Sequence, residues 1–243
     1  MRKSQLTGEN LLFHTGEPKF IYITNYKAGY TSVLTSLLET FPDIRAALWE
    51  KGLPPEEDFG DHFVFTFVRN PVDRVKSCFF DKVVVTPKAC LSMTEVPPPQ
   101  DCQLTIYRAC LEHLDRTAVP ARPSHREVLE RLRKLTFGEF VHLLPHICLT
   151  DVHFYPQSRW LDKFPVLRER CFFGRVETFG RDWATVTEHL GRPAPLLHEN
   201  RTDYGQADAE AVLDVATRQT IEAVYSTDFR DFYPAGISAA GRV

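Results

Sequence analysis

The fold is decided by the stretch FVFTFVRNPVDRVKS, residues 63–77, in which an apolar run leads straight into a helix start. The run over 63–68 is continuous rather than alternating, and continuous apolar strands belong inside parallel sheets that are covered on both faces. Asn70 is typical of a helix N-cap, Pro71 of a first helical residue and Asp73 of a first-turn acid. The stretch therefore predicts a buried strand followed by a helix.

The same succession of strand and helix occurs on both sides of this stretch. A short apolar strand is predicted over 20–23, and apolar residues at helical spacing predict a helix that ends before Pro42. The remaining elements are a strand predicted over 171–173 and helices over 125–135, from 136 to just before Pro145, over 181–190 and from about 208 to 225. Strands that alternate with helices indicate an α/β fold around a mostly parallel central sheet flanked by helices.

The length of 243 residues is enough for one large α/β domain, and we expect residues 1–243 to form a single domain. Residues 86–102 differ from their surroundings, because prolines flank a segment with little periodicity. Since motifs continue on both sides, this segment is predicted to be a loop or lid insertion rather than a linker.

The composition is that of an ordinary soluble globular protein, with 43% apolar and 25% charged residues. A net charge of −3 gives no reason to expect nucleic-acid binding, so any basic surface must be local and lie in a cleft. The sequence shows neither a targeting segment nor a run of the ~18 apolar residues that a membrane span needs. We therefore expect a soluble chain.

The six cysteines include no CxxC pair, which argues against a zinc site. An even number of cysteines without a signal peptide favours reduced thiols in a cytosol. One disulfide among Cys90, Cys102 and Cys110 is the alternative, if the chain works in an oxidising compartment.

A candidate phosphate-binding loop follows the first strand, with the sequence Lys27-Ala28-Gly29-Tyr30-Thr31-Ser32. A strand that feeds a helix N-terminus presents free backbone N–H groups and the positive end of the helix dipole. Gly29 permits close approach of the backbone to an oxyanion, and the hydroxyl groups of Thr31 and Ser32 can donate hydrogen bonds. Lys27 supplies a point charge. The alternative is an ordinary strand-to-helix turn with a surface lysine.

A second candidate anion site lies at the end of the 63–68 strand. Arg69 is placed where open α/β sheets bind ligands, and Ser77 lies eight residues later, about two turns into the helix. A guanidinium and a serine hydroxyl can together bind one phosphate. In the alternative interpretation Arg69 pairs with a carboxylate and Ser77 has no ligand. Two such sites suggest a ligand with two separated anionic groups.

Taken together, these residues resemble the sulfotransferases that use 3′-phosphoadenosine 5′-phosphosulfate (PAPS), in particular the carbohydrate branch. Lys27–Ser32 are similar to the family loop P-K-x-[AG]-x-[TS]-[ST], which binds the 5′-phosphosulfate. Arg69 and Ser77 are similar to the motif R-[ND/E]-P-x-x-R-x-x-S, which binds the 3′-phosphate. Tyr26 stands where the family usually has proline, a difference that removes no ligand.

Further similar segments follow in the family's order, so the resemblance runs from about Phe20 to Tyr233. They are His153–Ser158 (H-W-x-P-Q in the family), Phe173–Phe179 (G-x-x-E-x-[FL]), His198–Thr202 (H-x-N-x-[ST]) and Ile221–Tyr233 (ending in Y-x-x-D-[FY]-x-x-[FY]). The resemblance implies a P-loop-like three-layer fold and no catalytic metal. Because the sequence shows no membrane anchor, we expect a cytoplasmic enzyme, or a Golgi-lumen type whose anchor has been removed.

The resemblance implies transfer of a sulfuryl group from PAPS to a hydroxyl acceptor on a carbohydrate, with adenosine 3′,5′-bisphosphate as product. Lys27 is placed to stabilise the charge that develops on the leaving 5′-phosphate. Histidine suits the general base, and His153 is the first candidate and His62 the second. The third candidates are Glu50, Glu56 and Glu57. Asn200 and Arg201 are expected to close over the nucleotide; for them and for His153 a purely structural role is the alternative.

Two other function classes remain open at this point. The first is a nucleotide-binding protein of the same fold that transfers no sulfate. The second is a small-molecule P-loop kinase, which would need ATP and Mg²⁺ and the motif G-x-x-x-x-G-K-[ST], absent from this sequence.

Overall fold

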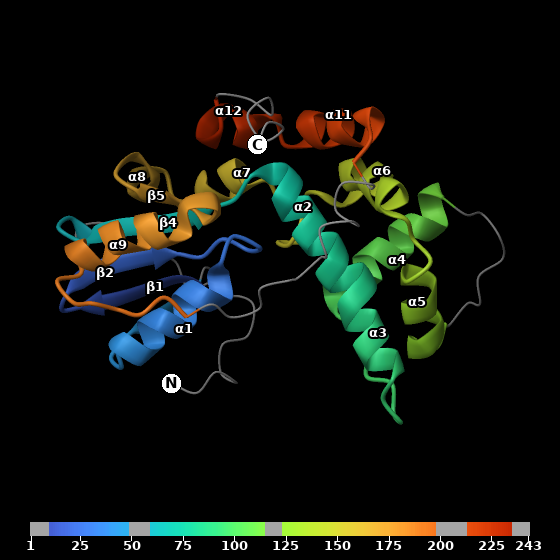
Figure 1. The fold of residues 1–243 in the computed structure, drawn as a ribbon, viewed down its shortest axis with the longest axis horizontal. Coiled ribbons are helices and arrows are strands. Elements are labelled where there is room, and N and C mark those ends of the chain that lie inside the picture. The colour runs from blue at the N-terminus through green and yellow to red at the C-terminus, as the bar shows by residue number, and fades with distance from the viewer. Residues whose placement is uncertain (1–9, 49–58, 115–122, 198–212, 235–243) are drawn as a thin grey trace. The chain divides into compact units, whose positions relative to one another are not determined.

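The computed structural model describes residues 10–48, 59–114, 123–197 and 213–234, and its contacts gather into two compact units (Figure 1). The sheet unit consists of the described parts of Met1–Arg69 and Trp160–Arg201. The helical unit consists of the described parts of Asn70–Arg159 and Thr202–Val243. That residues 1–243 act as one domain stays a prediction.

The sheet unit contains a mostly parallel sheet, with five strands among the described residues in the order β3-β1-β2-β4-β5. The strands are β1 (Asn10–Gly16), β2 (Lys19–Ile23), β3 (Arg45–Leu48), β4 (Phe63–Val68) and β5 (Phe172–Arg175). Strand β4 pairs in parallel with β2 and with β5, whereas β1 is antiparallel to β2 and β3. All strands except β1 thus run in one direction, which confirms the predicted fold class.

Strand β4 is buried from Val64 to Val68, as its unbroken apolar run predicts. The one hydroxyl in the run belongs to Thr66, whose Oγ1 donates a 2.7 Å hydrogen bond to the Ile23 carbonyl. The polar atom therefore has a partner inside the sheet, and its burial is not penalised.

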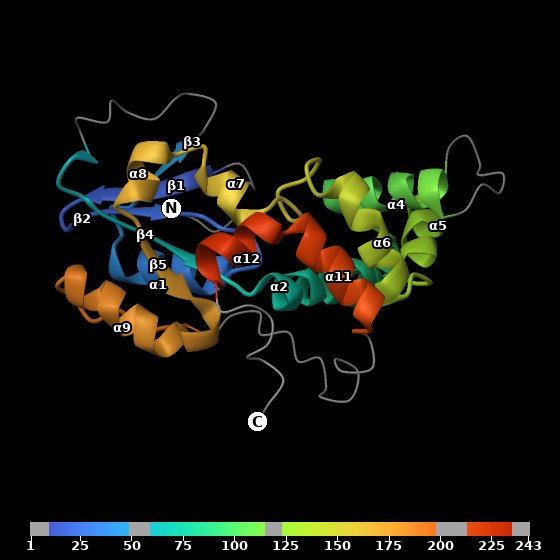
Figure 2. The same ribbon diagram turned by 90° about the horizontal axis from the view of Figure 1, so that it is seen from above.

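Helices cover both faces of this sheet. Helices α1 (Tyr30–Thr40) and α9 (Phe179–His189) share one face, where Leu37 and Trp183 pack in one cluster with Phe65 and Phe67. Figures 1 and 2 place α8 (Pro165–Glu169) over the opposite face. The result is the expected three-layer arrangement; a single 3-10 turn, η5 (Val176–Thr178), joins β5 to α9.

Gly174 in β5 leaves room for the ring of Phe67, its partner residue on the neighbouring strand β4. A Cβ added at Gly174 would lie 2.5 Å from Cε1 of Phe67, whose ring also packs against Phe179 with 4.7 Å between centroids. We expect Gly174→Ala to destabilise the protein by about 1–3 kcal/mol in urea unfolding, because an overpacked core must shift. The control is Gly180→Ala in α9, where an added Cβ meets nothing within 4 Å. Equal unfolding midpoints for both variants would contradict this account.

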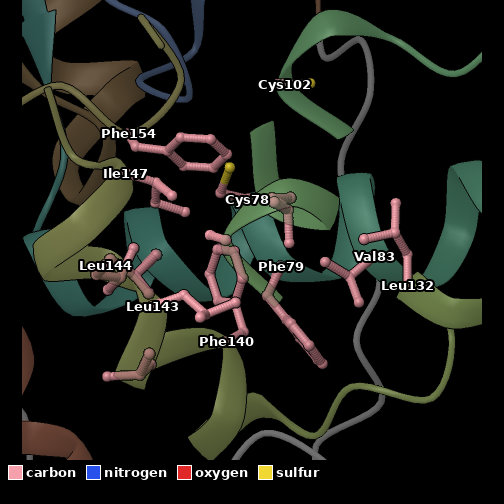
Figure 3. Close-up of a cluster of buried hydrophobic side chains, with 14 of the residues drawn as sticks. Cys78, Phe79, Val83, Cys102, Leu132, Phe140, Leu143, Leu144, Ile147 and Phe154 are labelled. Atoms are coloured by element: carbon pink, nitrogen blue, oxygen red, sulfur yellow. The ribbon is translucent and has the colours of Figure 1, made fainter. Parts of the chain in front are cut away.

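The helical unit is built around helix α2, which begins where the sequence predicts. The Oδ1 atom of Asn70 accepts a 3.0 Å hydrogen bond from the Val72 amide, and Pro71 is the first helical residue. The other elements are the π-helix η4 (Phe80–Val85), α3 (Thr86–Leu91), α4 (Asp101–His113), α5 (His125–Leu132), α6 (Phe137–Ile147), α11 (Val215–Val224) and α12 (Ser226–Phe232). Figure 3 shows Phe79, Phe140 and Leu144 in the apolar core between them. Helix α7 (Gln157–Leu161) spans the sequence boundary between the units.

Two predicted element boundaries in this unit are wrong. Residues 86–102 are no continuous loop, because α3 occupies 86–91 and α4 begins at Asp101. Pro87 lies in the first turn of α3, directly after the π-helix η4. Helix α6 continues through Pro145 to Ile147, since Leu144 and Ile147 stay buried in the core. The predicted last helix is described only from Val215 onward.

Candidate active site

The Lys27–Ser32 loop joins the carboxyl end of β2 to the start of α1, and its backbone is strained. Lys27 has φ 64° and Gly29 has φ 75°, both in the left-handed region. A lysine there costs on the order of 1 kcal/mol or more, and such strain concentrates at ligand sites. The Phe179 ring would lie 2.9 Å from a Cβ at Gly29, so both the φ angle and the contact require glycine.

Buried contacts hold the segment before this loop in place. The Asn25 side-chain amide donates to the Phe67 carbonyl at 3.1 Å, and the Trp160 indole donates to the Thr24 carbonyl at 2.7 Å. Tyr26, which stands where the family usually has proline, is 9% exposed, and its ring lies 6.5 Å from that of Trp160. This tyrosine therefore packs against the protein interior directly before the loop.

The loop ends at a helix N-terminus suited to an anion. Helix α1 has Gly29 at its N-cap, no side-chain hydrogen bond capping it and no acidic residue in its first turn. Its first amide groups and the positive end of its dipole therefore favour a negatively charged ligand.

Arg69 lies at the same edge of the sheet as this loop. Its Nη1 atom donates to the Lys27 carbonyl at 3.5 Å, although the two residues are 42 positions apart. They meet because β2 and β4 are neighbouring parallel strands, whose carboxyl ends share one edge. The sheet unit thus brings the Arg69 side chain to the backbone of the Lys27–Ser32 loop.

Asp182 orders the turn that follows β5, and no sequence motif singles it out. Its carboxylate accepts hydrogen bonds from the Arg175 amide (2.8 Å), the Thr178 hydroxyl (2.8 Å) and Nε of Arg181 (2.9 Å). Burial raises the pKa of this carboxyl, but the hydrogen bonds lower it by more, so it stays ionised. The turn fixes Phe179, the residue that packs on Gly29.

The structure does not bring His62 to the loop. It precedes the first residue of β4, whereas Arg69 follows the last one, so the two occupy opposite ends of this strand. His62 instead packs against Phe59 with 5.2 Å between ring centroids, and its Nδ1 lies 3.4 Å from Asp61. We therefore do not carry His62 forward as a general base.

The other predicted site residues are divided between the helical unit and the undescribed ranges. Ser77 is buried on α2 in the helical unit, one turn after Arg74, which is also buried. Five predicted residues lie outside the described residues: Glu50, Glu56, Glu57, Asn200 and Arg201.

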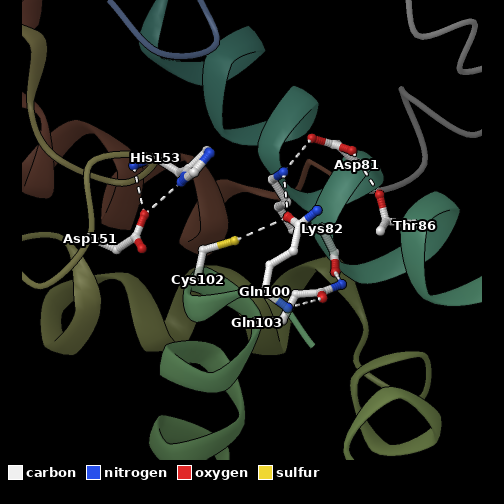
Figure 4. Close-up of polar contacts among 8 residues, drawn as sticks. All are labelled: Asp81, Lys82, Thr86, Gln100, Cys102, Gln103, Asp151 and His153. Carbon is white, nitrogen blue, oxygen red and sulfur yellow. Dashed lines mark hydrogen bonds and ion pairs between the residues drawn. The ribbon is translucent and has the colours of Figure 1, made fainter. Parts of the chain in front are cut away.

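His153 belongs to the helical unit and is paired with a carboxylate. Its Nδ1 lies 2.7 Å from Oδ1 of Asp151, and its backbone amide donates to the same oxygen at 2.9 Å (Figure 4). The side chains are 22% exposed for His153 and 13% for Asp151. Burial raises the pKa of Asp151, but the hydrogen bonds from His153 and the charges of His153 and Lys82 together lower it below its ordinary value. The pair therefore combines an ionised carboxylate with an accessible imidazole.

The segment that carries His153 is tied to the last two helices. The Tyr225 hydroxyl donates to the Phe154 carbonyl at 2.8 Å. The fully buried Asp228 carboxylate accepts hydrogen bonds from the amides of Gln157 (2.9 Å) and Ser158 (2.8 Å) and from the Ser158 hydroxyl (2.7 Å). Two segments that lie far apart in the sequence, 153–158 and 221–233, thus bind one another.

Comparison with known protein families identifies the family to which this chain belongs. A sequence model described as the sulfotransferase family matches residues 44–234, more than half of the chain. The chain belongs to the sulfotransferase family. It is therefore a PAPS-dependent transferase that acts on an acceptor. Neither a curated protein nor a solved structure matches the chain.

The sulfotransferase match includes Arg69, Ser77 and His153 but begins after the Lys27–Ser32 loop. The loop presents the uncapped start of α1, and the Arg69 guanidinium lies beside the Lys27 carbonyl, an arrangement that suits an anion. Among the described residues, no three His, Cys, Asp or Glu side chains are arranged to hold a metal ion. Of the described helices, none is long and apolar enough to cross a membrane. The six cysteines all lie within the described residues, and none of them forms a disulfide.

Proposed function

We propose that this sulfotransferase transfers the sulfuryl group of PAPS to a hydroxyl of a carbohydrate. The observation that carries the proposal is the strained Lys27–Ser32 loop beside Arg69 in a member of this family. In the reaction a bond forms between the acceptor oxygen and sulfur. The bond from sulfur to the bridging oxygen of the 5′-phosphate breaks, and the hydroxyl proton passes to a base.

Lys27 has the electrostatic role in this proposal. Negative charge grows on the bridging oxygen as the sulfur–oxygen bond breaks, and a fixed cation at the α1 N-terminus stabilises that charge. The Thr31 and Ser32 hydroxyl groups and the amides of the loop hold the 5′-phosphate. Holding donor and acceptor in line supplies much of the remaining rate enhancement.

The remaining assignments of the proposal come from the sequence motifs. Arg69 and Ser77 bind the 3′-phosphate, and Asn200 and Arg201 contact the nucleotide. His153 is the general base. A carbohydrate is proposed as acceptor because the motifs resemble those of the carbohydrate branch, and the location proposed from the sequence is cytoplasmic.

The test compares thermal stabilisation by adenosine 3′,5′-bisphosphate and by ATP. At 100 times its Kd a ligand adds about 2.7 kcal/mol of stability, so the bisphosphate will raise the melting temperature clearly. ATP lacks the 3′-phosphate and will raise it far less. A rise with ATP alone would support the kinase alternative and overturn the proposal.

A transfer assay separates the enzyme from an inactive nucleotide-binding protein. With ³⁵S-labelled PAPS and a panel of glycans and glycolipids, we expect label on at least one carbohydrate. Binding of the bisphosphate without transfer to any carbohydrate or other hydroxyl acceptor would favour the inactive alternative.

A further inference from the structure

The contact between His153 and Asp151 fixes which nitrogen of the imidazole carries the proton. An ionised carboxylate can only accept hydrogen bonds, so the ring nitrogen at 2.7 Å, Nδ1, must be the donor. In the neutral ring the lone pair is then on Nε2. The neutral histidine can therefore accept a proton only at the nitrogen that points away from Asp151.

Asp151 is itself held in the orientation that this contact requires. The amide of His153 donates to Oδ1 at 2.9 Å, and the Asp151 carbonyl accepts hydrogen bonds from the Phe154 and Tyr155 amides at 3.0 and 3.1 Å. The carboxylate thus belongs to a tight turn. Ring and backbone of His153 share one acceptor oxygen, which couples the orientation of the imidazole to the fold of the turn.

Three other ionisable side chains line the hollow beside His153, and none of the three is a carboxylate. Arg74 and Cys78 from α2 and Tyr225, which lies between α11 and α12, line the same small hollow as the ring. Burial raises the pKa of Tyr225 well above its ordinary value, so this phenol is neutral. Lys82 on η4, whose amine is 2.8 Å from Oε1 of Gln100, adds positive charge that favours an ionised Asp151 (Figure 4).

We propose that Asp151 is a positioning residue of the sulfuryl transfer, which holds His153 with Nδ1 protonated so that Nε2 takes the proton of the acceptor hydroxyl. The imidazolium that results is stabilised by the Asp151 carboxylate, while the acceptor oxygen bonds to sulfur and the bisphosphate leaves. This inference rests on the proposed function, because it concerns the base of that reaction.

The kinetic test uses Asp151→Ala, Asp151→Asn, His153→Ala and the double variant Asp151→Ala/His153→Ala. We expect Asp151→Ala to lower kcat roughly 10- to 100-fold with little change in the KM of the acceptor. Asp151→Asn keeps an acceptor oxygen and so keeps the turn, and it will recover part of this loss. The double variant will be no slower than His153→Ala, because both residues act as one unit. Losses that multiply, or a wild-type kcat for Asp151→Ala, would overturn the proposal.

A measurement without turnover separates this proposal from the proposed function. In ¹⁵N-edited spectra of the neutral ring, wild-type His153 will be protonated on Nδ1, and Asp151→Ala will shift the population toward the Nε2 tautomer. A wild-type ring protonated on Nε2 overturns the proposal whatever the activity. Stabilisation by the bisphosphate will be equal in all variants, so its failure in the wild type would count against the donor assignment alone. Glu130→Gln removes an exposed carboxylate of α5 and serves as the control.

Discussion

Replacing Lys27 with methionine will lower kcat by at least about 10²–10³-fold, so that a standard assay registers no transfer. The substitution removes the charge and keeps the aliphatic side chain. Its backbone carbonyl, which accepts the hydrogen bond from Arg69, is unchanged. The leaving 5′-phosphate then loses its nearest proposed cation at the moment when charge develops on the bridging oxygen. Initial rates with labelled PAPS measure the effect.

The fold will survive this substitution. Methionine has a Cβ like lysine, so the strain at φ 64° is the same in both proteins and the melting temperature will change little. The matched control is Lys134→Met, which removes an exposed lysine from the helical unit. A Lys27→Met enzyme with nearly wild-type kcat would refute the electrostatic role of this residue.

Replacing Asp228 with alanine will destabilise the protein by roughly 3–5 kcal/mol. The carboxylate is fully buried, and its loss leaves the Gln157 amide, the Ser158 amide and the Ser158 hydroxyl without this partner. Each unsatisfied buried donor costs about 1–3 kcal/mol, with less than full additivity. Urea unfolding monitored by circular dichroism measures the loss.

Asp228→Ala will also lower transfer, because the segment that it anchors contains His153. Asp231→Ala is the control on the same helix: its carboxylate bonds to Nε of the adjacent, exposed Arg230 at 2.8 Å, and such a pair contributes about 1 kcal/mol or less. If both variants unfold at the same urea concentration, Asp228 is not the anchor described above.

The strand-to-helix junctions were the most predictable part of this fold. Strand β4, the Asn70 cap and the start of α2 occur at the predicted residues, because a continuous apolar run and an Asn-Pro pair are local signals. Strands β1 and β3 were not predicted. Each is held by antiparallel pairing at one side of the sheet, a tertiary contact that leaves no periodic signal in a short segment.

The candidate site was predicted unevenly, for reasons of geometry. Lys27 and Arg69 meet because parallel strands end at a common edge, and this rule needs only the order of strands and helices in the sequence. The same rule applied to His62 would have placed it at the far end of β4, since it precedes the strand. Asp151 was missed because the family motif begins at His153, whereas the partner of this histidine lies two residues before it.

At Lys27 the left-handed backbone lowers the stability of the fold, whereas the proposed function needs the lysine side chain at this position. The loop already has its strained conformation in the folded protein, so binding of the proposed donor need not order it. Glycine at this position would relieve the strain and raise the melting temperature but would remove the cation. Selection for thermal stability alone would therefore favour loss of the cation of the proposed donor site, so stabilising substitutions should be sought outside the loop.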